Sequence, residues 1–118
     1  MKTIIAGSRT ITDLSLLEEV IKESGFNITE VVCGGARGVD ELGRKWAENK
    51  VPVKLFIANW NVFGKRAGYI RNVEMGNYAE ALILLWDGRS KGSKHMLDIA
   101  DKKGLKIYLH IIGEKWKT

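Results

Sequence analysis

Glycine, serine and arginine residues gather at three places in this sequence, each directly after a short apolar run, and together they could bind an anion. Glycine lets the backbone turn sharply where a strand ends, and an anion can then approach the N–H groups closely. The guanidinium group of arginine offers a planar fork that matches phosphate or carboxylate oxygens. One such loop by itself is better explained as a tight turn, whereas three together favour a nucleotide or phosphate crevice. The loops are Gly7-Ser8-Arg9, Gly34-Gly35-Ala36-Arg37-Gly38 and Asp87-Gly88-Arg89-Ser90-Lys91-Gly92-Ser93.

The third loop leads into a predicted helix whose first turn could hold a phosphate. Ser93 is expected to be the N-cap of this helix, and the backbone N–H groups near it carry partial positive charge. A phosphate on Gly92 and Ser93 would be held by these N–H groups, by the serine hydroxyl and by Lys91. The alternative is that Ser93 only caps its helix. For Asp40, in the first turn of another predicted helix, a favourable interaction with the helix dipole and a ligand contact are equally good interpretations.

An aromatic and basic segment between residues 60 and 75 could bind the remainder of such a ligand. Trp60 could stack on a nucleobase or fill the bottom of the domain, and its polar surroundings favour the ligand or its cavity. Lys65, Arg71 and Asn72 gather near the start of a predicted helix. The residues of that helix expected to supply a core face are Tyr69, Ile70, Val73 and Met75.

Two common nucleotide-binding motifs are missing from the sequence. It contains neither G-x-G-x-x-G nor G-x-x-x-x-G-K-[ST], so ordinary NAD binding and Walker-type ATP hydrolysis are not expected. No acidic residue is clearly placed to bind a ribose. Cys33 is the single cysteine, and the two histidines are far apart, so known zinc spacings cannot be assembled and no cofactor is predicted.

Composition indicates one globular domain over residues 1–118. The chain is 45% hydrophobic and 28% charged, and its net charge of +5 favours anionic partners without choosing between a nucleotide and a nucleic acid. A single cysteine fits a reducing compartment. Neither a signal-peptide layout nor a membrane-spanning run is recognised, so a cytoplasmic location away from membranes is expected.

Strands and helices are expected to alternate along the chain, which is typical of an α/β fold with a parallel sheet between two layers of helices. We expect a Rossmann-like sheet of about five strands in the order 3-2-1-4-5, so that the first and third glycine loops face each other. Strands are predicted at Lys2–Ala6, Glu30–Cys33, Pro52–Ile57, Ala81–Trp86 and Leu105–Ile111. Helices are predicted at Asp13–Ser24, Gly38–Asn49, Arg66–Tyr78 and Ser93–Lys103, with a loop at Trp60–Lys65.

Taken in order, these residues resemble the SLOG superfamily, and within it the small YspA-like branch of bacteria and phages. The match extends from residue 3 to about residue 104. It implies a Rossmann-like domain that binds a nucleotide or a nucleotide-derived small molecule. It also allows a homodimer, which the residues do not establish, and segment 110–117 is expected to pack across the sheet edge or form a dimer contact. The matching residues are the first two glycine loops with Val39 and Asp40, then Trp60, Gly64-Lys65, Ala67-Gly68, Arg71-Asn72, Met75, Trp86-Asp87-Gly88, Ser90 and Gly92-Ser93.

Relatives of different activity share this domain. LOG-type phosphoribohydrolases, which cleave the N-glycosidic bond of nucleoside monophosphates, use an arginine in R-K-x-x-M and a glutamate in P-G-G-x-G-T-x-x-E. Arg71, Asn72 and Met75 match the first motif, with asparagine in place of lysine. In the second motif Ser93 falls on the threonine and Met96 on the glutamate. A thioether can neither stabilise an oxocarbenium ion nor activate water, so binding carries over better than catalysis.

The leading hypothesis is a nucleotide-binding protein that acts as a sensor or carrier. In it the phosphate lies on Gly92 and Ser93, the ribose near Gly34–Gly38 and the base near Trp60 and Arg71. The predicted ligand-binding residues are Gly7, Ser8, Arg9, Gly34, Gly35, Arg37, Gly38, Asp40, Trp60, Lys65, Arg71, Asn72, Asp87, Gly88, Ser90, Gly92 and Ser93.

Two other functions stay open. One is an N-glycosidic hydrolase of nucleoside monophosphates, with Arg71 and Asp40 as the catalytic candidates and Asp87 as a further carboxylate. The other is nucleic-acid binding, suggested by the net charge and by a resemblance to DNA-processing protein A. It ranks below the first two because no stripe of alternating basic and aromatic residues is evident.

Overall fold

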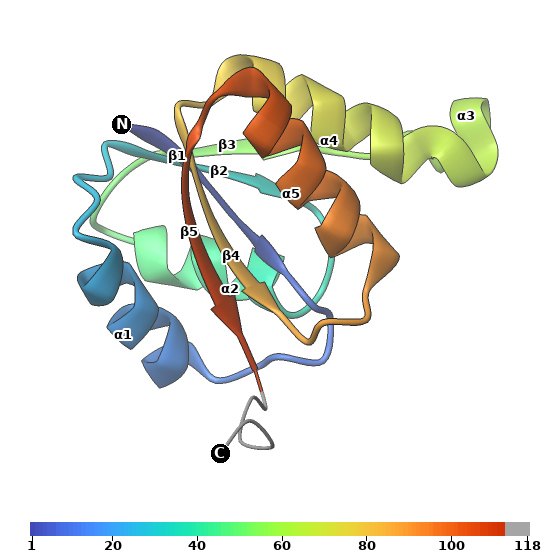
Figure 1. Cartoon of the computed structure of the whole chain (residues 1–118). Coiled ribbons are helices and arrows are strands. Elements are labelled where there is room, and N and C mark those ends of the chain that lie inside the picture. The colour runs from blue at the N-terminus through green and yellow to red at the C-terminus, as the bar shows by residue number, and fades with distance from the viewer. Residues whose placement is uncertain (113–118) are drawn as a thin grey trace.

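The computed structural model describes residues 1–112, and in them strands alternate with helices as the sequence predicts. The strands of this part of the chain form one parallel sheet in the order β3-β2-β1-β4-β5, which confirms the predicted α/β fold and strand order (Figure 1). The strands are β1 (Lys2–Gly7), β2 (Glu30–Gly34), β3 (Val53–Phe56), β4 (Ala81–Trp86) and β5 (Lys106–Ile111). The helices are α1 (Leu14–Ser24), α2 (Val39–Ala47), α3 (Trp60–Phe63), α4 (Ala67–Tyr78) and α5 (Lys91–Lys103), with a 3₁₀ turn at Gly64–Arg66.

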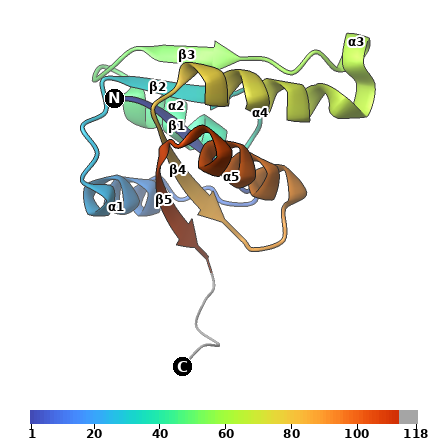
Figure 2. The same ribbon diagram turned by 45° about the horizontal axis from the view of Figure 1, so that its top comes forward.

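Helices cover both faces of the sheet because its central strands are apolar on both sides. On one face, Ile5 and Val31 are buried against α1 and α2. On the other face, Ile4 and Leu82 are buried against α4 and α5 (Figure 2). Cys33 belongs to the first of these two cores. The sheet is therefore the middle of three layers.

The order of the strands reverses between β1 and β4. Strand β1 pairs with β2 on one side and with β4 on the other, and Gly7 at its end lies opposite Leu85. The loops that follow β1 and β4 touch, since Asp87 N–H donates a hydrogen bond to Ser8 Oγ at 3.0 Å. Connections that leave such neighbouring strands for opposite faces of the sheet open a crevice outside their carboxyl ends.

The start of α5 differs from the sequence prediction. The helix begins at Lys91, and its N-cap is Ser90, whose hydroxyl accepts a hydrogen bond from Ser93 N–H at 3.4 Å. The prediction of Ser93 as the N-cap is therefore wrong. Both serines suit a cap by residue type. The preceding turn decides between them, because the Asp87 carboxylate accepts the N–H groups of Arg89 and Ser90 and directs the chain into the helix.

The predicted loop at Trp60–Lys65 is also wrong in part, since it contains α3 and the start of the 3₁₀ turn. Asn59 caps α3 by accepting a hydrogen bond from Val62 N–H at 3.2 Å. No side chain of α3 is buried, and the helix projects beyond the start of α4 (Figure 1). A single turn that needs no apolar stripe leaves no helical periodicity in the sequence. The contact predicted for segment 110–117 lies largely outside the described residues.

Candidate functional site

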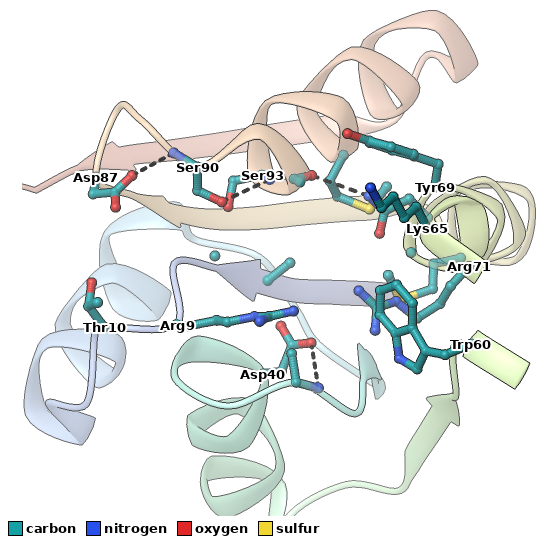
Figure 3. Close-up of a pocket in the computed structure, with 18 residues that line it drawn as sticks. Arg9, Thr10, Asp40, Trp60, Lys65, Tyr69, Arg71, Asp87, Ser90 and Ser93 are labelled. Carbon is teal, nitrogen blue, oxygen red and sulfur yellow. Dashed lines mark hydrogen bonds between the residues drawn. The ribbon is translucent and has the colours of Figure 1, made fainter.

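A cavity of about 460 Å³ opens at the carboxyl ends of β1 and β4 (Figure 3). The strand order predicts a binding crevice at this place. Its volume is within the range of pockets that hold small-molecule ligands. The residues that line it are Ala6, Gly7, Arg9, Thr10, Ala36, Asp40, Trp60, Lys65, Gly68, Tyr69, Arg71, Asn72, Met75, Asp87, Ser90, Gly92, Ser93 and Met96.

The loop between β4 and α5 forms one wall of the cavity, and its own side chains hold its shape. The Asp87 carboxylate accepts the N–H groups of Arg89 at 2.8 Å and of Ser90 at 2.9 Å, and these hydrogen bonds lower the pKa of Asp87. Within the described residues, the N–H groups of Lys91 and Gly92 make no hydrogen bond. They carry the partial positive charge of a helix N-terminus and could bind an anion.

Asp40 lies on the opposite wall, in the first turn of α2, where the residue is only 5% exposed. Its Oδ2 atom accepts a hydrogen bond from Ala36 N–H at 3.4 Å. Burial raises the pKa of Asp40 to about 7, although the charges of Arg71, Arg44 and Arg9 and the bond from Ala36 act in the opposite direction. The carboxyl group therefore gains or loses its proton near neutral pH, unlike an exposed aspartate.

Arg71 extends from α4 across the end of β2. A Cβ atom added to Gly34 would lie 2.8 Å from Arg71 Cζ, so glycine leaves the room that the guanidinium group occupies. The Nε atom of Arg71 is buried and finds no hydrogen-bond partner within residues 1–112. Leaving a buried donor unpaired costs about 1–3 kcal/mol. A ligand that accepts a hydrogen bond from this atom would remove that cost.

Asn72 connects α4 to the first turn of α5. Its Nδ2 atom donates to the Gly92 carbonyl at 3.2 Å and lies 3.1 Å from Nδ1 of His95. Burial lowers the pKa of His95, which favours the neutral ring that can accept from the amide. The ring of Tyr69 packs edge-to-face on His95, with centroids 4.6 Å apart. Asn72 thus positions the first turn of α5, and the side-chain amide of Asn72 is engaged by groups of the protein itself.

Trp60 and Lys65 stand at the outer end of the cavity, on α3 and on the 3₁₀ turn. Trp60 is 51% exposed, so most of one ring surface is available to another molecule. Figure 3 shows Trp60, Lys65 and Arg71 at the same end of the cavity. An exposed indole next to cationic side chains can stack on a planar aromatic group such as a nucleobase.

The structure brings most of the predicted ligand-binding residues together around this cavity. Ser8 does not line it, because the residue is buried and joins the ends of β1 and β4 through Asp87 N–H. Arg37 is exposed but does not line the cavity. The predicted residues that line it are Gly7, Arg9, Asp40, Trp60, Lys65, Arg71, Asn72, Asp87, Ser90, Gly92 and Ser93. Those that do not are Ser8, Gly34, Gly35, Arg37, Gly38 and Gly88.

Seven cavity-lining residues are absent from the predicted site. Tyr69 is 44% exposed, so its expected place in a core face is wrong. Met75, six residues later on the same helix, is both buried and at the cavity, so a core residue of α4 can also line the site. Met96, which falls where relatives carry glutamate, lines the cavity too. Small residues such as Ala6 carry no chemical signal. The residues are Ala6, Thr10, Ala36, Gly68, Tyr69, Met75 and Met96.

Among residues 1–112, no three His, Cys, Asp or Glu side chains come together in a way that could hold a metal ion. None of the helices described in this range has the length and apolar character that a membrane span requires.

Comparison with known proteins adds independent evidence. Residues 1–63 match the family described as "YspA, cpYpsA-related SLOG family", which confirms the resemblance noted in the sequence. The chain is 32% identical over 117 residues to the Gene 61 protein of Mycobacterium phage D29, covering 90% of this chain and 93% of that protein. Among solved structures, DNA processing protein A (DprA) from Streptococcus pneumoniae is similar with a TM-score of 0.75 at 20% identity. That likeness shows the fold; it covers 96% of this chain, which spans about half (52%) of the other.

Proposed function

The chain belongs to the YspA, cpYpsA-related SLOG family, and from that premise we propose that its crevice binds a nucleotide or a nucleotide-derived small molecule bearing a phosphate. The observation that carries the proposal is the buried Nε of Arg71, which has no hydrogen-bond partner among residues 1–112. Arg71 lines the same cavity as Gly92, whose N–H group makes no hydrogen bond to a described residue either. Both are donors that an anionic ligand would satisfy. Such a protein would act as a sensor or a carrier.

Charge in the cavity favours an anionic ligand. Arg9, Lys65 and Arg71 outnumber Asp40 and Asp87 among the charged residues that line it. The Asp87 carboxylate is already engaged by two backbone N–H groups. The raised pKa of Asp40 leaves much of that group uncharged at neutral pH. The field inside the cavity is therefore positive and attracts a phosphate.

The ligand can be placed by the chemistry of each wall. Its phosphate would lie at the start of α5, on Gly92 and the Ser93 hydroxyl, with Lys91 near. Its sugar would lie towards Asp40 and the loop after β2. Its base would lie against Trp60 and Arg71, because the indole is the exposed aromatic surface at the cavity.

Hydrolysis of the N-glycosidic bond is a second candidate, favoured by one observation. Asp40 is a buried carboxyl with a pKa of about 7 at the same cavity as Arg71. A group with such a pKa can donate a proton to a leaving base or accept one from water. Met96 supplies no carboxylate at the opposite wall, so Asp40 would have to carry this role.

A ligand panel tests both candidates on the same samples. We would incubate the protein with AMP, GMP, CMP, UMP and ADP-ribose, and follow the melting temperature and the masses present. Binding to the folded state alone stabilises it, by about 2.7 kcal/mol at a ligand concentration of 100 times Kd. A rise in melting temperature without new masses supports binding, and release of free base supports hydrolysis. No response to any compound would contradict the proposal and bring salt-dependent binding of single-stranded DNA forward.

A further inference from the structure

Asp40 is the only charged residue among residues 1–112 that is buried. It lies at the cavity, and Ala36 N–H at 3.4 Å is its one hydrogen-bond partner in the described part of the chain. A carboxylate has about four acceptor positions on its two oxygens. One weak hydrogen bond therefore leaves most of this capacity unused.

Three guanidinium groups influence Asp40 without pairing with it. Arg9 precedes α1, Arg44 lies on α2 with Asp40, and Arg71 comes from α4. The described residues contain a single ion pair, Lys94–Asp98, so none of these arginines makes a direct salt bridge to the carboxylate. Figure 3 shows Arg9 and Asp40 directed into the same part of the cavity.

We propose that Asp40 accepts a hydrogen bond from a sugar hydroxyl of the bound nucleotide, and that it thereby makes the crevice selective for ribose over sugars that lack hydroxyl groups. This inference rests on the proposed function. It revises the expectation that no acidic residue is clearly placed to bind a ribose, because the fold brings Asp40 to the cavity, and it gives a specific form to the ligand contact that the sequence left open for Asp40.

The surroundings of Asp40 disfavour a phosphate or a cationic group of the ligand at this wall of the cavity. A phosphate at this wall would meet a carboxylate with only one hydrogen-bond partner among the described residues. At the start of α5, the Asp87 carboxylate is already held by two backbone N–H groups, and the N–H group of Gly92 makes no hydrogen bond to a described residue. A cationic group would meet the field of Arg9, Arg44 and Arg71. A neutral donor remains, and an ionised or half-ionised carboxyl is a strong acceptor for it. Trp60 offers the surface for the base at another part of the cavity, which leaves the sugar for Asp40.

Binding of sugar analogues tests this inference. We would titrate the wild-type protein with each of the four nucleoside 5′-monophosphates in ribo, 2′-deoxy and 2′,3′-dideoxy forms. A hydrogen bond to a charged group predicts that the dideoxy form binds about 10-fold or more weakly than the ribo form. Asp40→Ala should reduce this ratio to within about twofold, because the acceptor is gone.

Two further variants keep the result interpretable. Asp40→Asn preserves the size of the side chain and remains a neutral acceptor, so it should fold and retain a smaller ratio than the wild type. Asp87→Asn is the matched control on the other wall, and its ribo-to-dideoxy ratio should equal that of the wild type even if its affinity changes. Circular dichroism and melting curves check that each variant is folded.

The outcomes separate the two proposals. Binding of ribo and dideoxy forms with equal affinity to the wild type would overturn the role of Asp40 and leave nucleotide binding intact. An Asp40→Asn loss that depends on the base and not on the sugar would overturn it as well. If no nucleotide binds in any form, nucleotide binding itself fails, and this inference fails with it.

Discussion

The glycines on the β1–α2 side of the crevice are crowded, whereas the glycine at the start of α5 is open. A Cβ atom added to Gly7 would overlap the carbonyl oxygen of Leu85, and one added to Gly38 would overlap that of Ser8. Gly38 also has a φ of +77°, which other residues rarely adopt. At Gly92, an added Cβ would meet nothing within 4 Å. Neighbouring atoms therefore require glycine on the β1–α2 side of the crevice, whereas they do not require it at Gly92.

This difference limits what glycine-rich loops reveal about a ligand. Crowding accounts for Gly7 and Gly38 without any bound molecule, because the backbone of a neighbouring segment needs the space. Gly92 has no such reason, and glycine in a helix is less stable than alanine by about 1 kcal/mol. Gly34 lies between these cases, since its close neighbour is the side chain of Arg71. We therefore expect Gly34 and Gly92, and not Gly7 or Gly38, to bear on function.

The largest change in stability is expected for a substitution at a crowded glycine. Gly7→Ala should lower the free energy of unfolding by about 3 kcal/mol or more, since the added methyl group meets the backbone of β4. Gly92→Ala is the matched change on the open side and should leave stability unchanged or raise it by up to about 1 kcal/mol. Urea unfolding of both variants measures the contrast. Equal losses in the two would show that crowding does not distinguish these loops.

The crowded side of the crevice also contains the buried carboxyl group of Asp40, which should make the stability of the protein depend on pH. Its pKa in the folded protein is about 7, above the ordinary 3.8, so the folded state holds the proton more tightly. The stability that this gives is complete below about pH 4 and is lost as pH rises through 7. From pH 5 to pH 8, the free energy of unfolding of Asp40→Asn should therefore rise by about 2.6 kcal/mol relative to that of the wild type. Parallel pH profiles of the two proteins in urea unfolding would contradict the raised pKa.

Gly34→Ala separates stability from binding at the position between the two cases. The methyl group would displace the flexible guanidinium of Arg71 and not a backbone segment. Stability should change by less than about 1 kcal/mol, while affinity for the nucleotide that binds best should fall about 10-fold because a charge-assisted hydrogen bond is lost. Unfolding and calorimetric titration of one preparation measure both quantities. A loss of stability with unchanged affinity would reverse this interpretation.

The smallest change in stability is expected at the N-cap of α5. Ser90→Ala removes the hydroxyl that accepts from Ser93 N–H and should lower the free energy of unfolding by about 1 kcal/mol. Ser93→Ala should cost less, since its hydroxyl makes no hydrogen bond to a described residue. Thermal unfolding of the pair measures the difference. A larger loss of stability in Ser93→Ala than in Ser90→Ala would indicate that Ser93 is the N-cap, as the sequence suggested.

The order of the strands could be predicted because each central strand is a continuous apolar run and each connection is a helix with recognisable ends. Gly25 and Gly104, both in the left-handed region, end α1 and α5 as their sequence positions indicate. The parallel order then follows from the handedness of the connections. Much of the site follows in turn, because the ends of neighbouring strands must meet.

Most features of the site that the sequence did not predict depend on contacts between segments that are distant in the chain. The choice between Ser90 and Ser93 as a cap is a local exception, because it follows from the turn in which Asp87 accepts the N–H groups two and three residues later. The engagement of Ser8 follows from its contact with the loop after β4, 79 residues away. Asp40 is buried at a cavity that it shares with Arg9, before α1, and with Arg71, on α4. Patterns within one segment hold no information about such contacts.

The most direct test of nucleotide binding is a calorimetric titration of wild type, Arg71→Met and Arg66→Met with AMP, GMP, CMP, UMP and ADP-ribose. Arg66 is the matched control, because it is exposed at the start of α4 and does not line the cavity. We predict that at least one compound binds the wild type and Arg66→Met alike and binds Arg71→Met about 10-fold or more weakly. Binding that Arg71→Met leaves unchanged, or no binding to any of the three proteins, would contradict the account.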